Sequence, residues 1–539
     1  MERPSAETQP WMGRGAALIT LATAVSRLTG LIRIVVVAYA MGATFLTDTY
    51  NSANTAPNLV FELLAAGVLT SVFVPTFVDH IVKGKERDTW EAGNAMTSVA
   101  LLALVGISLL VMLFAPAIMR LLLVGRTEDR ADAVAVGTDL LRLFAPQIIF
   151  YGVGMIMTGA LHAHRRFGMA AVAPIFNNVV VIGVYLAYAS MRGDSPPSVD
   201  SVTSSQIWVL GAGTTLGVVA MTLCLLPSLH RLGWRFRFRP DVRHPSVTRG
   251  ARLGAWALGY AGGYQAGLIA VLILANRIQG GVAGYQWAYT FFYLPHALFG
   301  VPIFNVLFTA MAEHEAKGER EALSERLRQG LAMLGFILVP VATGLAVLAH
   351  AVSTMTLDYG VMNQSGVDLV AKIMIGFAPG LPFYSAFLVF TRGFYAIGDA
   401  RTPALVNLAT MALTTVIGAA AFFALPHGWE VAGLALGHSA GFFVGASVLG
   451  TLLKKRLGTR RSLVDIQTFM GQVFSAAVAG VAMTLIVDLF DTSVKEQAVA
   501  AAVLGAIVGT VVYTGVALAT GAREPGRLLA VARSLKDRR

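Results

Sequence analysis

Apolar runs recur along the whole chain, and many reach roughly the 20 residues that a bilayer-spanning helix needs. Of the 539 residues, 56% are hydrophobic and only 13% are charged, whereas a soluble domain carries about 25% charged residues. Such a chain cannot cover itself with a water-compatible surface. We therefore expect about fourteen spans, at roughly 15–41, 47–78, 91–119, 133–161, 170–190, 205–229, 253–276, 284–311, 329–355, 367–391, 402–425, 431–453, 466–490 and 497–520.

Within a bilayer, backbone N–H and C=O groups must be satisfied inside the protein, so apolar runs of this length form helices. The expected fold is an all-α polytopic membrane protein. Residues 1–14 are polar, and Arg27 and Arg33 interrupt the apolar run that follows them. We therefore interpret residues 15–41 as an uncleaved first span rather than a signal peptide.

The basic residues are distributed unevenly among the connecting segments. Of 41 Lys and Arg residues, 31 fall in the N-terminus, alternate loops and C-terminal tail, and 6 fall in the opposite loops. Because basic loops remain cytoplasmic, this asymmetry predicts that both termini are cytoplasmic.

Two short patterns suggest an internal repeat. Asp79-His80-x-x-Lys83-Gly84 recurs as Glu313-His314-x-x-Lys317-Gly318 at an offset of 234, and Pro174-x-x-x-Asn178 recurs as Pro403-x-x-x-Asn407 at an offset of 229. Both offsets pair spans 1–6 with spans 7–12, as in transporters with parallel halves. The predicted organisation is a cytoplasmic N-terminus (1–14), an N-terminal lobe (15–229), a basic linker (230–252), a C-terminal lobe (253–453), two extra spans (454–520) and a basic tail (521–539).

The net charge of +11 does not indicate nucleic-acid binding, because the basic residues lie in short loops between spans. The linker sequence from Trp234 to Arg239 alternates aromatic and arginine residues. This pattern suggests an amphipathic strip on anionic membrane lipids, and a simple topology anchor is the alternative.

The sequence does not indicate an enzyme or a cofactor. Cys224 is the only cysteine, which excludes an intrachain disulfide and a cysteine metal cluster. No Ser/His/Asp set, paired catalytic carboxylates or phosphate-binding GxxxxGK[ST] motif is found. Three histidines within spans have no metal-ligand spacing and are expected to cap helices or line a cavity: His296, His350 and His438.

Charges inside spans are costly and usually mark a water-filled cavity or an ion pair. Arg27 and Arg33 are six residues apart, about 120° and about 9 Å on a helix, and neither has an acid three or four residues away. A guanidinium in this setting suits the oxygens of a phosphate-bearing ligand. The alternatives are a salt bridge to Glu62 or Asp48 and, for Arg33, snorkelling to the interface.

The other intramembrane charges favour structural interpretations. Glu62 is either the partner of Arg27 or a proton-coupling carboxylate. Two pairs of opposite charge have helical spacing and are expected to neutralise each other: Asp139 with Arg142, and Asp368 with Lys372.

An ordered series of short motifs resembles the MurJ (MviN) family of the multidrug/oligosaccharidyl-lipid/polysaccharide exporter superfamily. The series is Ser26-Arg27-Leu28-x-Gly30-x-x-Arg33, Gly42-Ala43 with Thr47-Asp48, Pro57-Asn58-Leu59, Gly67, Phe73-Val74-Pro75, Arg166-Phe167 with Ala173-Pro174-x-x-x-Asn178, and Gly393-Phe394-Tyr395-Ala396-x-x-Asp399-x-Arg401-Thr402-Pro403. Together these motifs cover spans 1–12.

The resemblance implies two six-helix lobes around a central cavity, with the two extra spans forming a groove for a lipid tail. It implies a flippase in the bacterial plasma membrane that moves lipid II, an undecaprenyl-pyrophosphate-linked peptidoglycan precursor, to the outer leaflet for cell wall biosynthesis. Alternating access would be driven by membrane potential or an ion gradient. Carried over to this sequence, Arg27 and Arg33 face the pyrophosphate, and Asp48 is a further functional residue.

This chain departs from the family pattern at three places. Many members carry an acid where this chain has Ile34, a basic residue where it has Phe61 and Glu62, and an arginine near Thr290. The cavity is therefore expected to be less basic than in those relatives.

The departures leave competing interpretations open. These are a flippase for another lipid-linked oligosaccharide, a drug or cation antiporter, a membrane glycosyltransferase and a non-transporting scaffold for cell-wall synthesis proteins.

Overall fold

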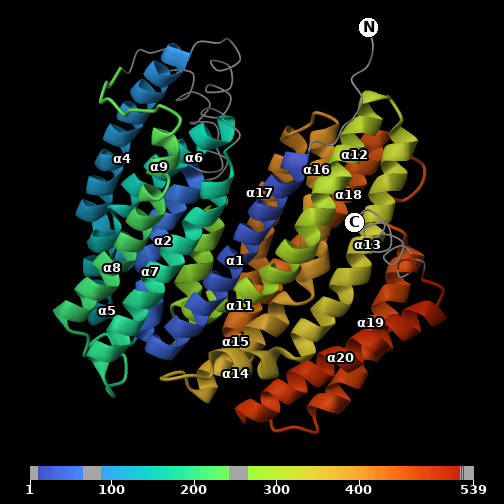
Figure 1. Cartoon of the computed structure of the whole chain (residues 1–539). Helices are drawn as coiled ribbons and strands as arrows, with labels where there is room; N and C mark the ends of the chain where they lie inside the picture. Colours follow the sequence, from blue (N-terminus) through green and yellow to red (C-terminus); the bar gives the residue numbers. More distant parts are fainter. Residues whose placement is uncertain are drawn as a thin grey trace. The chain divides into compact units, whose positions relative to one another are not determined.

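The computed structural model describes residues 10–64, 86–164, 166–241 and 265–522, together with Glu524 and Gly526. In these ranges every regular element is helical (Figure 1). The helices are α1 (Pro10–Met41), α2 (Phe45–Leu64), α4 (Glu86–Leu122), α5 (Arg130–Phe144), α6 (Gln147–Ala163), α7 (Gly168–Arg192), α8 (Ser204–Leu223), α9 (Leu226–His230), α11 (Gly281–Pro295), the π-helix η2 (His296–Gly300), α12 (Val301–Ala316), α13 (Arg320–Val347), α14 (Ala349–Leu357), α15 (Gln364–Phe377), α16 (Gly380–Ala396), α17 (Arg401–Ala424), α18 (Glu430–Leu457), α19 (Ile466–Val487) and α20 (Lys495–Ala519).

The expectation of an all-α multi-pass membrane protein is confirmed. Within the described ranges, 11 helices are long and apolar enough to cross a membrane, and 12 if the bent pair α15–α16 is one span. Two of the expected fourteen spans, 47–78 and 253–276, lie partly outside the described ranges. The described part of the first belongs to α2, and that of the second to the short apolar helix Gln265–Ala275.

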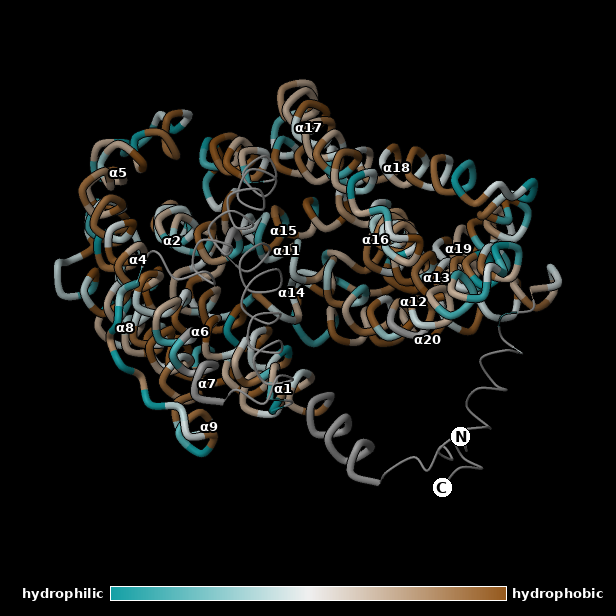
Figure 2. The backbone as a smooth tube through the Cα atoms, turned by 90° about the horizontal axis from the view of Figure 1, so that it is seen from above, coloured by the Kyte–Doolittle hydropathy of each residue, from teal (hydrophilic) through white to brown (hydrophobic). Residues whose placement is uncertain are grey.

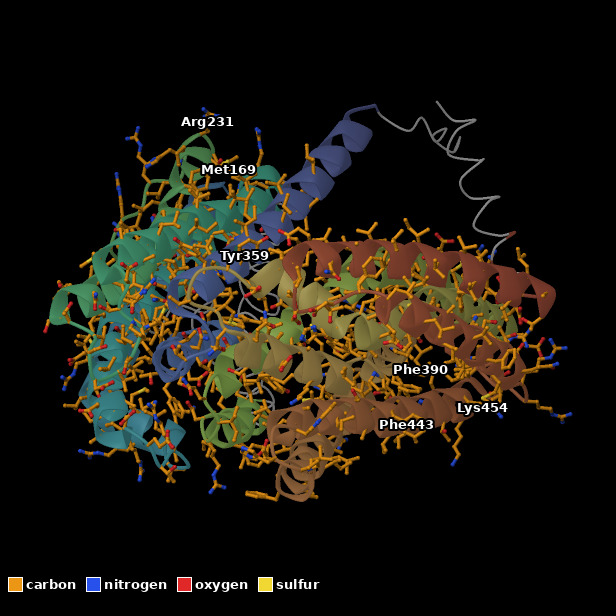
Figure 3. All side chains as sticks on the ribbon, turned by 90° about the horizontal axis from the view of Figure 1, so that it is seen from below. Met169, Arg231, Tyr359, Phe390, Phe443 and Lys454 are labelled. Carbon is orange, nitrogen blue, oxygen red and sulfur yellow. The ribbon has the colours of Figure 1, made fainter. Side chains whose placement is uncertain are left out.

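Hydropathy follows the helical architecture. Figure 2 shows hydrophobic residues along the helices, while the segment that follows α9 is largely hydrophilic. Basic side chains lie at helix ends, such as Arg231 after α9 and Lys454 in the last turn of α18 (Figure 3). This is the arrangement that anchors spans between two aqueous phases.

The chain divides into two compact units, Met1–Gln265 (unit 1) and Ala266–Arg539 (unit 2). The division falls within the expected span 253–276, and α19 and α20 belong to unit 2. In unit 1, α7 packs against both α1 and α8, and α2 packs against α5 and α6. A Cβ atom at Gly217 of α8 would lie 2.6 Å from Oδ1 of Asn177 in α7, so glycine permits this close helix contact.

In unit 2, α18 packs on α17 through four glycines spaced by four residues: Gly433, Gly437, Gly441 and Gly445. A Cβ atom at Gly433 would lie 2.7 Å from the backbone carbon of Ala421, and a Cβ atom at Gly437 would meet the backbone of Gly418. Small residues at this spacing let two helix backbones approach closely, which drives helix association in lipid. We call these four residues the glycine stripe.

Several expected spans contain breaks. The span expected at 367–391 consists of α15 and α16, which are bent by 47°. Pro379 lies at this break and has no backbone N–H to continue the helical ladder. The span expected at 284–311 contains η2, which directly follows Pro295. Prolines and π-turns are the usual causes of such kinks.

The linker strip from Trp234 to Arg239 lies along α4. The Trp234 ring is buried and donates from Nε1 to Oδ1 of Asn94 at 3.2 Å. The backbone N–H of Arg239 donates to Oγ of Ser98 at 2.8 Å, while Phe236 and Phe238 are exposed together with the arginines. The strip is thus fixed by its backbone and by one buried tryptophan, while its two phenylalanines and its arginines are exposed.

Candidate functional site

The α1 segment that carries both arginines is held by Asn178 of α7. Nδ2 of Asn178 donates to the carbonyl of Ser26 at 3.2 Å and to Oγ1 of Thr29 at 3.0 Å. The motif at span 1 and the Pro-x-x-x-Asn motif at span 5 therefore meet in space. At about 100° per residue, Arg33 lies on the same stripe of α1 as Ser26, whereas Arg27 lies about 100° away from it.

Arg33 lies on the stripe of α1 that includes Ser26, the residue held by α7. Its half-buried guanidinium lies within electrostatic range of three tyrosine hydroxyls, those of Tyr50, Tyr151 and Tyr185. Within the described part of the chain, no acid forms an ion pair with Arg33. Its charge therefore lies in the neighbourhood of neutral hydroxyl groups, which suits binding of an anion.

The tyrosines beside Arg33 belong to an ordered hydrogen-bond chain. Tyr185 donates its hydroxyl to Tyr50 at 3.2 Å, and the Tyr50 hydroxyl lies 2.7 Å from Oγ1 of Thr214. Thr214 donates to the carbonyl of Leu210 at 2.6 Å, so Tyr50 is the donor to Thr214. Satisfied buried networks of this kind are rigid, and this one gives Arg33 a fixed polar wall.

Tyr151 connects the same wall to α2. Its hydroxyl donates to Oδ1 of Asn58 at 3.1 Å, within the motif Pro57-Asn58-Leu59. Its ring packs on Phe61 with centroids 4.6 Å apart. Phe61 stands where many family members carry a basic residue, so aromatic packing occupies that position here.

Arg27 and Glu62 are both exposed on their helices. Glu62 accepts a hydrogen bond at its Oε2 from Nε2 of Gln265, at 2.7 Å. A neutral amide from a distant part of unit 1 therefore reaches this carboxylate, and the pairing of Glu62 with Arg27 stays a prediction.

Asp48 lies in the first turn of α2 and is fully buried. Its cationic neighbour is Arg126, from the segment between α4 and α5, which is only 2% exposed. Burial lowers the pKa of Arg126, and the nearby Asp48 carboxylate opposes that shift. Arg126 also donates from Nη1 to Oγ1 of Thr49 at 3.1 Å and stacks 4.0 Å above the Phe45 ring.

Asp48 lies close to the turn between α1 and α2, whereas the two arginines of α1 lie farther from this turn along the helix axis. Arg33 is eight residues before the end of α1 at Met41, about 12 Å along the helix axis, and Arg27 is about 21 Å from that end. The α1–α2 turn between them is tight, because Gly42 has a φ of 62° and Thr47 donates to its carbonyl at 2.7 Å. The structure therefore groups Asp48 with Arg126 at the turn.

One of the two expected intrahelical pairs is formed. Arg142 and Asp139 are 3.7 Å apart on the surface of α5. The prediction of an Asp368–Lys372 pair is wrong, because Asp368 contacts Nε2 of His350 at 2.8 Å and Lys372 lies 5.7 Å from the Trp429 ring centroid. Side chains from neighbouring helices replace the local partner in this case.

The remaining histidines are packed in unit 2. His296 is 1% exposed, and its Nδ1 lies 2.9 Å from Oγ of Ser385. His438 is surrounded by aromatic rings, with the Phe442 centroid at 4.6 Å and the Phe292 centroid at 5.3 Å. Both histidines are therefore part of an aromatic core.

Sequence reasoning missed several residues of the site. Arg126 was counted only as a loop charge, and nothing in its sequence context marks it as buried. Tyr50 and Tyr185 carry no spacing signal either. Asn178 was part of a recognised motif, but its role as the anchor of α1 appears only when α1 and α7 are seen packed together.

Comparisons with known proteins agree with this architecture. A family model described as "Lipid II flippase MurJ" matches residues 37–505, a region that includes Asp48 and Glu62 and begins after Arg33. A "Probable lipid II flippase MurJ" of Rhizobium tropici is 27% identical over 474 residues, which cover 86% of this chain and 85% of the relative. A "Lipid II flippase MurJ" of Burkholderia cenocepacia is 26% identical over 447 residues, covering 82% and 84%.

Solved structures show the same fold. The structure titled "Lipid II flippase MurJ, inward closed conformation" superposes with a TM-score of 0.73 at 19% identity, covering 93% of this chain and 98% of that one. An inward-facing multidrug resistance MATE transporter of the MOP superfamily gives a TM-score of 0.65 at 13% identity, covering 81% and 98%. Since the family model spans most of the sequence, this chain belongs to the MurJ lipid II flippase family.

Proposed function

We propose that this protein is a flippase that moves lipid II from the cytoplasmic to the outer leaflet of a bacterial plasma membrane, by alternating access, for peptidoglycan synthesis. Family membership supports the substrate class. The observation that carries the proposal is the Arg33 guanidinium, which lies near the hydroxyls of Tyr50, Tyr151 and Tyr185 without an acidic partner among the described residues.

Arg33 is the proposed pyrophosphate-binding residue, and Arg27 is proposed to contact the headgroup from the exposed face of α1. A unit charge about 4 Å from a guanidinium gains about 4 kcal/mol at an effective dielectric constant of 20. Moving a two-state equilibrium from 1:99 to 99:1 takes about 5.5 kcal/mol of differential binding. Two arginine contacts made in only one state are therefore enough to bias the transport cycle.

Asp48 and Glu62 are proposed to act in gating rather than in binding. Asp48 is fully buried beside Arg126, where it stabilises the α1–α2 turn. Glu62 is bonded to Gln265, the last residue of unit 1. A carboxylate bonded to a neutral amide at that position is able to exchange partners when the chain changes conformation.

A flippase for another polyprenyl-pyrophosphate-linked oligosaccharide is the second candidate. Phe61, at a position that is basic in many family members, packs its ring on Tyr151 at 4.6 Å. Near the position of a further family arginine, Thr290 donates its hydroxyl to the carbonyl of Gln286 at 3.0 Å. A less basic cavity favours a headgroup with less negative charge beyond its pyrophosphate.

The test is transport in proteoliposomes that contain labelled lipid II or an unrelated lipid-linked sugar. Arg33→Ala is expected to slow lipid II translocation about tenfold or more, because a hydrogen bond to a charged group contributes about 1.5–3 kcal/mol. Arg33→Lys should retain part of the rate, since lysine keeps the charge but loses the bidentate fork.

Arg142→Ala is the matched control, because Arg142 is an intramembrane arginine of the same unit that is 49% exposed and paired with Asp139. Its rate should equal that of the unmodified protein. If Arg33→Ala translocates lipid II at the rate of the unmodified protein, the proposal is refuted. If the unmodified protein transports the unrelated lipid-linked sugar faster than lipid II, the alternative substrate is favoured.

A further inference from the structure

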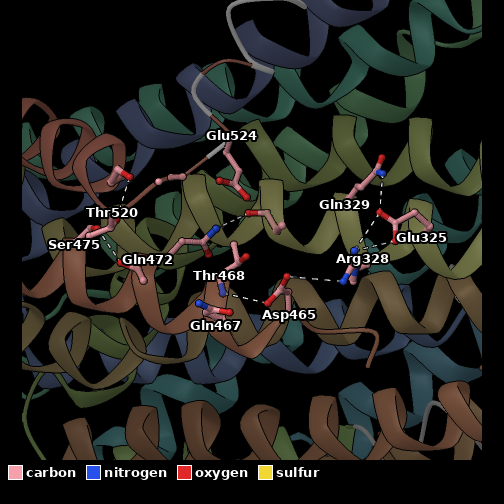
Figure 4. Close-up of a pocket in the computed structure, with 15 residues that line it drawn as sticks. Glu325, Arg328, Gln329, Asp465, Gln467, Thr468, Gln472, Ser475, Thr520 and Glu524 are labelled. Carbon is pink, nitrogen blue, oxygen red and sulfur yellow. Dashed lines mark hydrogen bonds and ion pairs between the residues drawn. The ribbon is translucent and has the colours of Figure 1, made fainter. Parts of the chain in front are cut away.

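A polar cavity of about 390 Å³ lies where one end of each of three helices of unit 2 meets the others. The first turns of α13, the beginning of α19 and the end of α20 line it (Figure 4). None of its residues belongs to the site on α1 and α2. The charged and polar side chains that line the cavity indicate which kind of ligand fits it.

Among the described residues that line the cavity there is one cation, Arg328, which contacts two carboxylates and remains partly exposed. Arg328 lies 3.1 Å from Oε2 of Glu325 and 3.9 Å from Oδ2 of Asp465. Gln329 donates to the other oxygen of Glu325 at 2.9 Å. Asp465 also caps α19 by accepting from the N–H of Thr468 at 3.2 Å. These two carboxylates therefore have their partners.

Glu524 does not. Its side chain is only 4% exposed, and its Oε2 has no hydrogen-bond partner. Figure 4 shows this carboxylate pointing into the cavity, toward Gln472 and Thr468. The hydroxyl of the nearby Tyr513 is buried and also lacks a partner. A buried carboxylate oxygen without a donor is costly, so the site calls for a ligand that donates.

Three polar side chains of the cavity wall use their donors within the protein. Ser475 gives its hydroxyl hydrogen to the carbonyl of Gly471 at 2.8 Å, and Thr520 gives its own to the carbonyl of Val516 at 3.0 Å. Gln472 uses its amide to donate to the carbonyl of Ala332 at 2.9 Å. Among the described lining residues, Glu524 is the carboxylate that keeps a buried oxygen without a hydrogen-bond partner. A primary ammonium group, with three N–H donors and a positive charge, complements it.

The position of the cavity indicates the source of that group. The α19 residues beside it present large apolar side chains on the outer surface: Ile466 is 67% exposed, Met470 57% and Phe474 58%. Such a surface at the end of a spanning helix meets lipid chains, which places the cavity at headgroup level. Arg328, 31% exposed at the cavity, offers a cation to a phosphate next to the ammonium.

We propose that this cavity binds the zwitterionic headgroup of an aminophospholipid, with its primary ammonium on Glu524 and its phosphate toward Arg328. The site is separate from the transported cargo and binds a lipid of the surrounding membrane. It gives α20 a lipid-dependent contact with α13 and α19.

The test uses the full-length protein in detergent, with bound lipid counted by native mass spectrometry during titration with phosphatidylethanolamine, phosphatidylcholine or phosphatidylglycerol. Phosphatidylethanolamine should bind best, because the trimethylammonium of phosphatidylcholine donates no hydrogen bonds and phosphatidylglycerol carries no cation. Glu524→Gln should weaken phosphatidylethanolamine binding about tenfold, as expected for the loss of a charged hydrogen bond. Glu524→Asp should retain most of it.

Glu496→Gln, at the exposed opposite end of α20, is the control and should bind like the unmodified protein. Equal binding of phosphatidylcholine and phosphatidylethanolamine would overturn the ammonium assignment. Equal loss in Glu524→Gln and Glu524→Asp would show that Glu524 has only a structural role. Displacement of the lipid by millimolar ethanolamine or spermidine would assign the site to a soluble amine, against the lipid proposed here.

Discussion

At the scale of single residues, two arginines of unit 1 have opposite electrostatic surroundings. Arg126 is 2% exposed and lies within electrostatic range of the fully buried Asp48, as well as of Asp129 and Glu128. Arg33 is half-buried among neutral hydroxyls and has no acidic partner in the described ranges. A buried cation surrounded by acids serves the local structure, whereas a cation without an acidic partner is available to a ligand.

This contrast predicts different results for the two arginines. Arg126→Ala should lower the free energy of unfolding by about 3 kcal/mol, because it removes a buried cation that interacts electrostatically with Asp48. It also removes the hydrogen bond to Thr49 and the contact with the Phe45 ring. Adding Asp48→Asn should recover the electrostatic part of the loss, because the neutral amide no longer requires a nearby cation. A double-mutant cycle measured by unfolding in detergent checks the coupling. Strictly additive effects of the two substitutions would contradict it.

At the scale of helices, unit 2 depends on backbone contact along the glycine stripe of α18. The glycines at 433, 437, 441 and 445 repeat every four residues and lie against α17. Lipid chains are as apolar as leucine, so helix association in a bilayer depends on packing at such contacts. The least yielding point is Gly437, where an added Cβ atom would meet the backbone of Gly418, which cannot rotate away as a side chain can.

Gly437→Ala should therefore lower the unfolding free energy by about 1–3 kcal/mol, the usual cost of overpacking. Gly515→Ala is the matched control, because Gly515 lies inside α20, four residues before its end, and a Cβ atom there has nothing within 4 Å. It should be neutral or stabilising, since alanine favours a helix over glycine by about 1 kcal/mol. Thermal unfolding of the two purified variants measures the difference, and equal midpoints would refute close packing at the stripe.

The sequence predicts long elements better than their interruptions or partners. Spans are readable because each must supply about 20 apolar residues by itself. The break at Pro379 was not predicted, because neighbouring helices can tolerate proline within a span. The Asp368–Lys372 pairing failed for a similar reason, since His350 of α14 reaches Asp368 from outside α15. Residue spacing in the sequence predicts contacts within one helix, but it does not predict contacts between side chains of different helices, such as that between His350 and Asp368.

At the scale of the whole chain, the two units have different interiors. Unit 1 carries Arg27 and Arg33 within its first span. Unit 2 places His296 and His438 in an aromatic core, where both rings contact Tyr384 at centroid distances of 4.9 and 5.9 Å. This asymmetry assigns the proposed anion binding to unit 1, although the two halves carry related sequence motifs.

The orientation of the chain can be tested through its single cysteine. Cys224 donates from its thiol to the carbonyl of Met221 at 2.9 Å, and serine can make the same bond, so Cys224→Ser should give a stable cysteine-free background. Two exposed loop serines then serve as matched reporters, Ser195 after α7 and Ser462 before α19. Because the segment 454–465 holds five Lys and Arg residues, positive-inside topology places Ser462 in the cytoplasm and Ser195 outside. A membrane-impermeant maleimide should label Ser195→Cys in intact spheroplasts and Ser462→Cys only after permeabilisation.

The reverse labelling pattern would show that the chain has the opposite orientation in the membrane, with both termini outside. Labelling of both cysteines in intact spheroplasts would refute the proposed arrangement of spans, because it would place the two loops on the same side.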